Sequence, residues 1–219
     1  MNQAISRKLF VALLLVAAGL ALNACGSGKA TRGDTAGKDT RNTMLVSVRD
    51  QRMLLLRDGK PVKSYVVSTS KFGVGSEPSS NRTPLGRMQV ARKIGDGQPM
   101  GMVFKGREPT GEILQPNVPL RDPIVSRILW LTGTERHNSN TFQRMIYIHG
   151  TPEEWRLGRP ASYGCIRMGM QDVVDLYNRV GEGAEVRVIQ GSLRQTPEGK
   201  SYARQRPGDA EYLRRASFH

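Results

Sequence analysis

Short apolar runs bounded by Gly, Pro, Asn or Asp fill the chain from residue 44 to residue 190. Runs of this length between turn residues are typical of β-strands. One segment, 170–180, instead carries apolar residues at three- and four-residue spacing and is followed by Gly181, which predicts a helix. The pattern therefore predicts a single mainly β domain over 44–190. The expected strands are 44–48, 53–56, 62–68, 87–92, 100–104, 128–132, 145–149 and 185–189.

The segments on either side of this domain are polar. Residues 26–43 contain no large apolar side chain, so they cannot bury enough surface to offset their conformational entropy. Residues 25–43 are therefore predicted to be a flexible tether. Residues 191–219 are basic and have few apolar anchors, and we predict a mobile or loosely docked tail there.

The first twenty-four residues have the features of a signal peptide. Arg7 and Lys8 precede an apolar run at 9–22, and a small residue, Ala24, follows it. This order is typical of a secretory leader. The apolar run is about fourteen residues long, whereas a bilayer span needs roughly 20. A cleaved leader over 1–24 is therefore favoured over a transmembrane helix.

The end of this leader, Leu22-Asn23-Ala24-Cys25, resembles the lipobox of bacterial lipoproteins. The resemblance implies that Cys25 becomes the first residue after cleavage and carries acyl chains that anchor the protein to a membrane. Gly26, rather than Asp, after the cysteine favours the periplasmic face of the outer membrane if the source has two membranes. The alternative is an ordinary signal peptide with an incidental cysteine.

The chain is strongly basic. It has 33 Lys and Arg against 19 Asp and Glu, a formal charge of +14 that falls to +12 without the two cations of the leader. Anionic partners are expected. An exported chain does not normally meet chromosomal nucleic acid, and the sequence has no nucleic-acid-binding motif. The expected anionic partner is therefore lipid or cell wall. Two cysteines and three histidines leave little material for a metal site. We expect a monomer.

One pair of residues carries candidate chemistry. His149 and Cys165 are sixteen residues apart, and each has a glycine beside it. If a strand ending at His149 meets a turn at Cys165, the imidazole can activate the thiol as a nucleophile. The alternative is an inert buried cysteine and a structural histidine. Lipidation of Cys25 would leave Cys165 without a disulfide partner, which favours a thiol that is used.

The segments around this pair resemble a known family. His149-Gly150-Thr151 followed by Ser162-Tyr163-Gly164-Cys165-Ile166-Arg167-Met168 is similar to the signature of the bacterial L,D-transpeptidase catalytic domain, the YkuD-like family. The likeness extends to Arg82-Thr83-Pro84-Leu85-Gly86 upstream and to 172–189 downstream, so it covers about 44–190. It implies an L,D-transpeptidase-like β-sandwich with one or two short helices.

The chemistry that this resemblance implies is acyl transfer on peptidoglycan stem peptides. Cys165 would attack the carbonyl that joins the third stem residue to D-Ala, release D-Ala and form a thioester, while His149 takes the thiol proton. The carbonyl of Gly150 would orient the histidine. Backbone N–H groups at Gly164 and Cys165 would form an oxyanion hole. An amine of a neighbouring stem would then resolve the thioester into a cross-link. The resemblance implies that this chemistry needs no metal and no organic cofactor.

Three other signature residues have open roles. Tyr163 stands where the family commonly has His, so a substrate contact there would pass through a phenol hydroxyl. Arg167 either assists the reaction electrostatically or pins the loop by hydrogen bonds. Ser162 either contacts substrate or caps the turn.

Several functions fit the same residues. Water as acceptor gives an L,D-carboxypeptidase, and a protein acceptor gives an enzyme that attaches an outer-membrane protein to peptidoglycan or detaches it. A wall-binding lipoprotein that keeps the fold without catalysis is the alternative from a different class.

Overall fold

A computed structural model describes residues 37–119 and 121–208. The strands are β1 (Asn42–Ser47), β2 (Arg52–Arg57), β3 (Lys60–Ser68), β4 (Gly86–Ile94), β5 (Met102–Lys105), β6 (Glu108–Ile113), β7 (Ile124–Gly133), β8 (Tyr147–Gly150), β9 (Ile166–Met168) and β10 (Glu185–Ile189). The helices are α1 (Met170–Arg179) and α2 (Pro197–Gln205), with short 3-10 helices η1 (Arg136–Asn138), η2 (Glu154–Arg156) and η3 (Leu193–Gln195). The mainly β fold class is confirmed.

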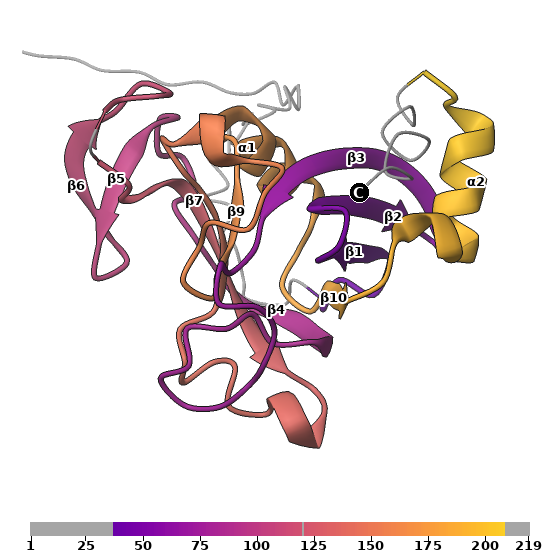
Figure 1. The fold of residues 1–219 in the computed structure, drawn as a ribbon. Coiled ribbons are helices and arrows are strands. Elements are labelled where there is room, and N and C mark those ends of the chain that lie inside the picture. The colour runs from indigo at the N-terminus through magenta and orange to yellow at the C-terminus, as the bar shows by residue number, and fades with distance from the viewer. Residues whose placement is uncertain (1–36, 120, 209–219) are drawn as a thin grey trace, which may run out of the picture. The chain divides into compact units, whose positions relative to one another are not determined.

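The strands form one sheet that closes on itself. Their order is β4-β10-β1-β2-β3-β9-β8-β7-β5-β6, and a further pairing joins β4 to β7 (Figure 1). This pairing links eight strands into a ring, and the β5–β6 hairpin continues from β7 outside it. Closure gives the strands of the ring partners on both edges, which removes the unpaired N–H and C=O groups of an open sheet.

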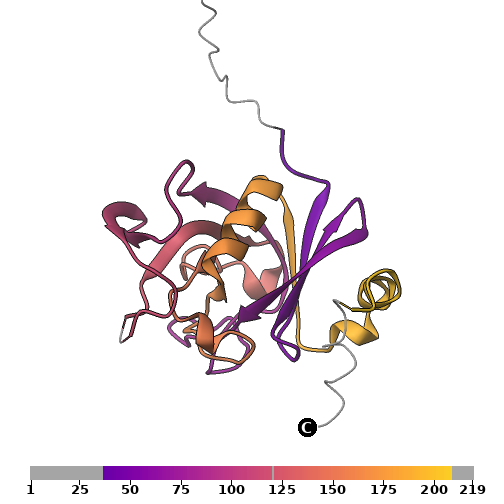
Figure 2. The ribbon, with the colours of Figure 1, turned by 90° about the horizontal axis from the view of Figure 1, so that it is seen from above.

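The main core follows from the period-two alternation of the ring strands. Every second residue points to one side and is buried there, because successive side chains on a strand face opposite ways. Helix α1 adds its apolar stripe to the same core, and Figure 2 shows it between β1–β3, drawn in purple, and the strands drawn in magenta. The alternating core residues include Met44, Val46, Met53, Leu55, Tyr65, Val67, Met88, Val90, Leu129, Leu131, Ile148, Ile166, Met168, Val186 and Val188.

Most of the predicted elements are present. The helix expected over 170–180 is α1. At its first residue, the Met170 N–H donates a hydrogen bond to the Glu154 carboxylate at 2.7 Å. An acceptor at this end also suits the helix dipole. Two strands escaped prediction. β6 is exposed along its whole length and has no apolar run, and β9 is only three residues long.

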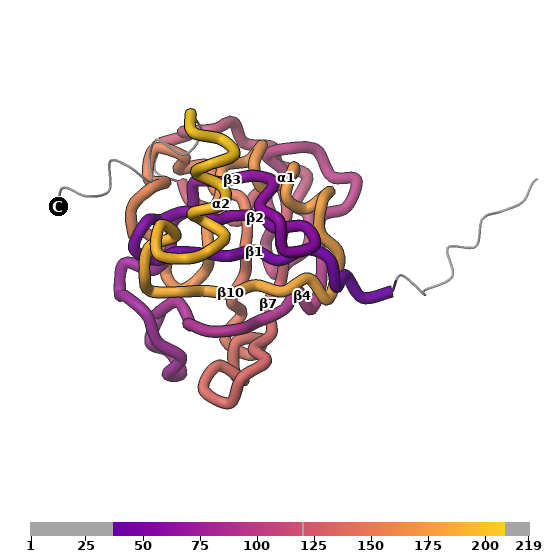
Figure 3. The backbone as a smooth tube through the Cα atoms, turned by 90° about the vertical axis from the view of Figure 1, so that its right-hand side faces the viewer, coloured from indigo at the N-terminus to yellow at the C-terminus, as the bar shows by residue number. Residues whose placement is uncertain are grey.

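The prediction of a mobile or loosely docked tail at 191–219 is wrong for the residues that the structure describes. Helix α2 begins after Thr196, whose side chain accepts a hydrogen bond from the Gly199 N–H, and it covers the outer face of β1 and β2 (Figure 3). Leu193 and Tyr202 are buried there against Leu45, Leu54 and Leu56. Two apolar side chains are enough to hold this segment on the sheet, because the three leucines face outward and form a second apolar surface. Residues 209–219 lie outside the described part.

The domain also begins earlier than predicted. The Asp39 carboxylate accepts hydrogen bonds from the backbone N–H of Gly181 and from the Asn42 side chain, so the last residues of the expected tether are attached to the domain. The leader, Cys25 and the rest of the tether lie outside the described residues. Neither helix that the structure describes is long and apolar enough to cross a membrane.

Candidate active site

Strands β8 and β9 position His149 and Cys165 on neighbouring segments. The two strands are parallel neighbours, with Ile148 paired to Ile166. His149 follows the first of these core residues and Cys165 precedes the second. Side chains alternate along a strand, so both polar residues face away from the main core. Strand register therefore places the two residues on the same face.

The His149 ring has one nitrogen committed to the backbone. Its Nδ1 lies 2.9 Å from the carbonyl oxygen of Gly150, and the side chain is buried. A carbonyl only accepts, so this contact assigns the proton to Nδ1 and leaves the lone pair on Nε2. Burial lowers the pKa of His149 to about 4, and the nearby charge of Arg167 acts in the same direction. The imidazole is therefore neutral at neutral pH.

Gly150 has a steric reason to be glycine. A Cβ built on it would lie 2.5 Å from the carbonyl oxygen of Val125 and 3.0 Å from the Val173 side chain. The first distance is shorter than real Cβ contacts, and the atom it meets belongs to the backbone of β7. The strand that carries His149 can approach β7 this closely only without a side chain at residue 150.

The Cys165 sulfur lies among backbone groups. Sγ accepts a hydrogen bond from the Tyr147 N–H at 3.4 Å and donates one to the Met145 carbonyl at 3.5 Å. The residue is half-buried and has no disulfide. Burial raises the pKa of the thiol to about 11, against the opposing effect of the Tyr147 N–H and of the Arg167 and Arg144 charges. Both the thiol and the imidazole are therefore uncharged at neutral pH.

The turn before Cys165 is held by its own hydrogen bonds. Ser162 Oγ donates to the Cys165 carbonyl at 2.6 Å and accepts from the Gly164 N–H at 3.3 Å. Ser162 is buried, so the structure favours the capping alternative for its hydroxyl. Gly164 has φ = +119°, a conformation that side chains rarely adopt.

Thr83 ties this turn to the upstream block of the signature. Its hydroxyl accepts a hydrogen bond from the Ser70 N–H and donates one to the Gly164 carbonyl, both at 3.0 Å. Thr83 is fully buried. Its place in the Thr-Pro-Leu-Gly block was visible in the sequence, but a supporting role under the cysteine turn was not.

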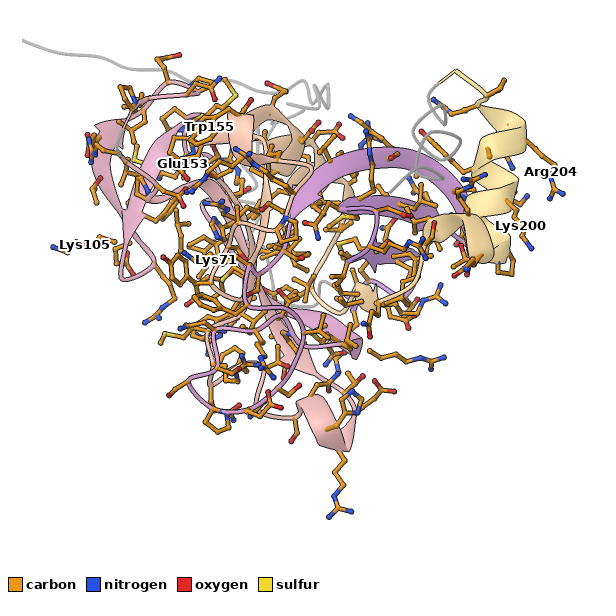
Figure 4. All side chains as sticks on the ribbon, in the orientation of Figure 1. Lys71, Lys105, Glu153, Trp155, Lys200 and Arg204 are labelled. Carbon is orange, nitrogen blue, oxygen red and sulfur yellow. The ribbon has the colours of Figure 1, made fainter. Side chains whose placement is uncertain are left out.

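Arg167 is buried in an ion-pair network behind His149. It is 3% exposed and pairs with Asp122 and, at 3.4 Å, with Glu153, which Figure 4 labels. The Thr151 hydroxyl also donates to Asp122. These contacts favour the pinning alternative for Arg167. Sequence reasoning missed both acids, because they lie 45 and 14 positions away and no local pattern links them to the arginine.

Tyr163 lies at the surface of the site and is 61% exposed. Its hydroxyl accepts a hydrogen bond from Lys71 Nζ at 2.8 Å. A cavity of about 400 Å³ opens beside it, a size in the range of small-ligand sites. The cavity is lined by Pro78, Ser79, Asn81, Asn140, Gln143, Arg144, Met145, Ile146 and Tyr163. Met145 and Tyr163 link this space to the surroundings of Cys165.

Within 37–119 and 121–208, no group of three His, Cys, Asp or Glu side chains is placed to hold a metal ion. The chemistry available at the site is that of a thiol, an imidazole and backbone N–H groups.

Comparison with known proteins identifies the family. The profile of YkuD, the L,D-transpeptidase catalytic domain, matches residues 41–188. The chain therefore belongs to this family, and the resemblance seen in the signature residues is confirmed. A search of curated proteins found no match.

Among solved structures, the chain is similar to an L,D-transpeptidase from Mycobacterium smegmatis, with 17% identity, 68% of this chain and 58% of that chain covered, and a TM-score of 0.42. It is also similar to an L,D-transpeptidase from Xylanimonas cellulosilytica, with 15% identity, coverages of 70% and 62% and a TM-score of 0.44. A third similar structure is the C442S mutant of the Enterococcus faecium L,D-transpeptidase. Its sequence identity is 18%, 68% of this chain and 50% of that chain are covered, and the TM-score is 0.42. The chain spans less than two thirds of the length of these proteins.

Proposed function

We propose that the protein is a cell-wall L,D-transpeptidase that works through a thioester on Cys165. The observation that carries the proposal is the shared outer face of β8 and β9, where His149 and Cys165 flank the Ile148–Ile166 pair. Membership of the YkuD family supports the same reaction class. Peptidoglycan stem peptides are the proposed substrates.

The proposed reaction starts from the neutral pair. His149 Nε2 takes the thiol proton as Sγ attacks the carbonyl carbon before D-Ala, and the Nδ1–H bond to the Gly150 carbonyl stabilises the imidazolium that forms. The imidazolium then protonates the departing amine of D-Ala, and the carbonyl re-forms as a thioester. An acceptor amine attacks this thioester, passes its proton back to His149 and leaves an amide and the free thiol.

A backbone donor is available for the oxyanion of this reaction. The Tyr147 N–H donates to Sγ, so it would stabilise the thiolate rather than the oxyanion. The Gly164 N–H is held by Ser162 Oγ at 3.3 Å, a long hydrogen bond that the oxyanion can replace. Removal of one such donor typically lowers the rate ~10²–10³-fold.

The test uses the full chain incubated with a disaccharide-tetrapeptide. Intact mass reports a thioester adduct, and chromatography of the muropeptides reports D-Ala, cross-linked dimer and tripeptide. Wild type and His137→Gln, a matched control at an exposed histidine, should form adduct and dimer. Cys165→Ala should form neither, and His149→Gln should be slower by about 10²–10⁴-fold.

The outcomes separate the alternatives. Tripeptide without dimer would make the protein a carboxypeptidase, and turnover only with a protein amine would make it an attachment enzyme. Stem binding with no adduct in wild type would contradict catalysis and favour the wall-binding lipoprotein.

We also propose that Cys25 is acylated and anchors the chain to a membrane, at the periplasmic face of the outer membrane if the source has two membranes. The lipobox-like Leu22-Asn23-Ala24-Cys25 supports this assignment. Cells fed an alkyne-labelled fatty acid should label wild type and Cys165→Ala equally, and Cys25→Ala should lose the label. Separation of the membranes then shows where the labelled protein lies. Label on Cys25→Ala, or label in the inner membrane alone, would contradict one part of the proposal.

A further inference from the structure

Lys71 is an exposed cation held by aromatic side chains rather than by an acid. Its Nζ lies 2.8 Å from the Tyr163 hydroxyl, 4.2 Å from the centre of the Tyr163 ring and 5.3 Å from that of Phe72. Cation–π contacts of this kind orient an ammonium group. Among the ion pairs of the described residues, none involves Lys71, so no carboxylate of this part of the chain neutralises it.

The surroundings of this lysine are positive. The charges of Lys71, Arg156 and Arg167 all lower the pKa of the Tyr163 phenol, and Lys71 has the largest effect. Arg156 and Arg167 have acidic partners of their own in Glu153 and Asp122. The charge of Lys71 therefore remains available to a ligand.

The Lys71–Tyr163 pair is attached to the cysteine turn. The Lys71 N–H donates to the Ser162 carbonyl at 3.1 Å, and Ser70 pairs with Ser162 in an isolated parallel bridge. Tyr163 is two residues before Cys165. The pair therefore has a defined position relative to the nucleophile that we propose.

We infer that Lys71 and Tyr163 form a binding site for a carboxylate of the peptide stem. The ammonium group has three N–H donors, of which one goes to the phenol oxygen, and the phenol keeps its own proton to donate. Two donor atoms 2.8 Å apart suit the two oxygens of one carboxylate, and the lysine makes this a charge-assisted contact. This inference rests on the proposed function for its substrate class.

Phe72 and the cavity beside Tyr163 complete the surface. The Phe72 and Tyr163 rings are 5.5 Å apart at 55°, and both are exposed, as is Met145, whose carbonyl accepts from Cys165 Sγ. Exposed apolar groups gathered around one turn indicate a contact surface. The apolar part of the stem can lie along them while its carboxylate meets the lysine.

The test is binding to the full chain with Cys165→Ala, which removes turnover from the measurement. Titration calorimetry compares the tetrapeptide stem, the stem with its terminal carboxyl amidated, and the stem with the α-carboxyl of its glutamate amidated. The two amidated stems distinguish which carboxylate is bound. Lys71→Met should weaken binding of the acid stem about ten- to a hundredfold, the range of a hydrogen bond to a charged group.

The control and conservative variants separate this effect from misfolding. Lys71→Arg should keep most of the affinity, and Tyr163→Phe should lose part of it while keeping the ring. Lys200→Met, in α2 and far from Lys71 in Figure 4, should change nothing. Amidation of the recognised carboxyl should weaken binding to the chain that keeps Lys71 but not to the Lys71→Met variant, so the two losses should not add.

Equal weakening of the acid stem and of both amidated stems by Lys71→Met, or no weakening of any of the three, would overturn the inference, and so would the absence of any stem binding. Adduct formation by the wild-type chain, measured in parallel, tests the proposed function separately. An adduct without Lys71 dependence contradicts only the carboxylate site. Lys71-dependent binding without an adduct contradicts only the transpeptidase.

Discussion

Nδ1 of His149 lies 2.9 Å from the carbonyl oxygen of Gly150, the next residue in the chain. The orienting group of the candidate base is thus supplied by its own strand. Gly150 serves this arrangement twice, through its carbonyl and through the missing Cβ that allows β8 to lie against β7. The consequences concern proton binding, packing and the ionic network behind the ring.

The buried neutral His149 should make stability depend on pH. In the folded protein the ring binds a proton only below about pH 4, whereas the unfolded chain binds it below about 6.5. Between these values the unfolded state holds more protons, so the free energy of unfolding should fall as the pH falls from 6.5 to 4. Urea unfolding of wild type and His149→Gln at several pH values measures this. The variant should lose this component, and His137→Gln should keep it.

The reactivity of Cys165 should reflect a thiol rather than a thiolate at neutral pH. Because burial raises its pKa to about 11, the rate of alkylation by iodoacetamide should keep rising above about pH 9. Peptide-resolved mass spectrometry in a Cys25→Ala background follows this one sulfur. A plateau near about pH 8.5, the behaviour of an ordinary cysteine, would contradict the expectation.

Gly150→Ala should destabilise the protein by about 1–3 kcal/mol, because the new Cβ meets the Val125 carbonyl and forces the strands apart. Gly37→Ala is a matched control, since a Cβ there has nothing within 4 Å. Urea unfolding compares the two variants. Equal stabilities would show that β8 and β7 adjust at no cost.

Arg167→Met should cost about 3–5 kcal/mol, because it leaves Asp122 and Glu153 beside the site without their buried cation. Arg41→Met is the control. Its ion pair with Asp58 is exposed on both sides, and such pairs contribute little to stability because water screens them. Denaturant midpoints should therefore differ clearly between the two variants, and similar midpoints would mean that Arg167 does not pin the network.

Tyr202→Ala should destabilise the protein by about 3–5 kcal/mol, the cost of deleting a large buried ring. The ring covers the outward leucines of β2 together with Leu193. Lys200→Ala, on the exposed side of the same helix, should have little effect. Thermal unfolding distinguishes them. A Tyr202 variant as stable as wild type would return α2 to the role of a loosely docked tail.

Much of the fold was determined by local pattern. Short apolar runs bounded by turn residues located most of the strands, and the three- and four-residue spacing at 170–180 located α1, since a helix buries one face by repeating it. Alternation around Ile148 and Ile166 carries His149 and Cys165 to one face. The pair itself was singled out by its residue types, by the glycine beside each residue and by the resemblance of its segments to the family signature.

Only the tertiary structure decided the rest. Closure of the ring by β4 and β7, the burial of Tyr202 on outward leucines, and the pairing of Arg167 with Asp122 depend on surfaces that meet after folding. Lys71 belongs to this group as well, because its contact with Tyr163 spans 92 positions. The local sequence pattern predicts which face of a strand or helix a residue occupies. The partner across that face is chosen by packing of distant segments, whose contacts leave no period in the sequence.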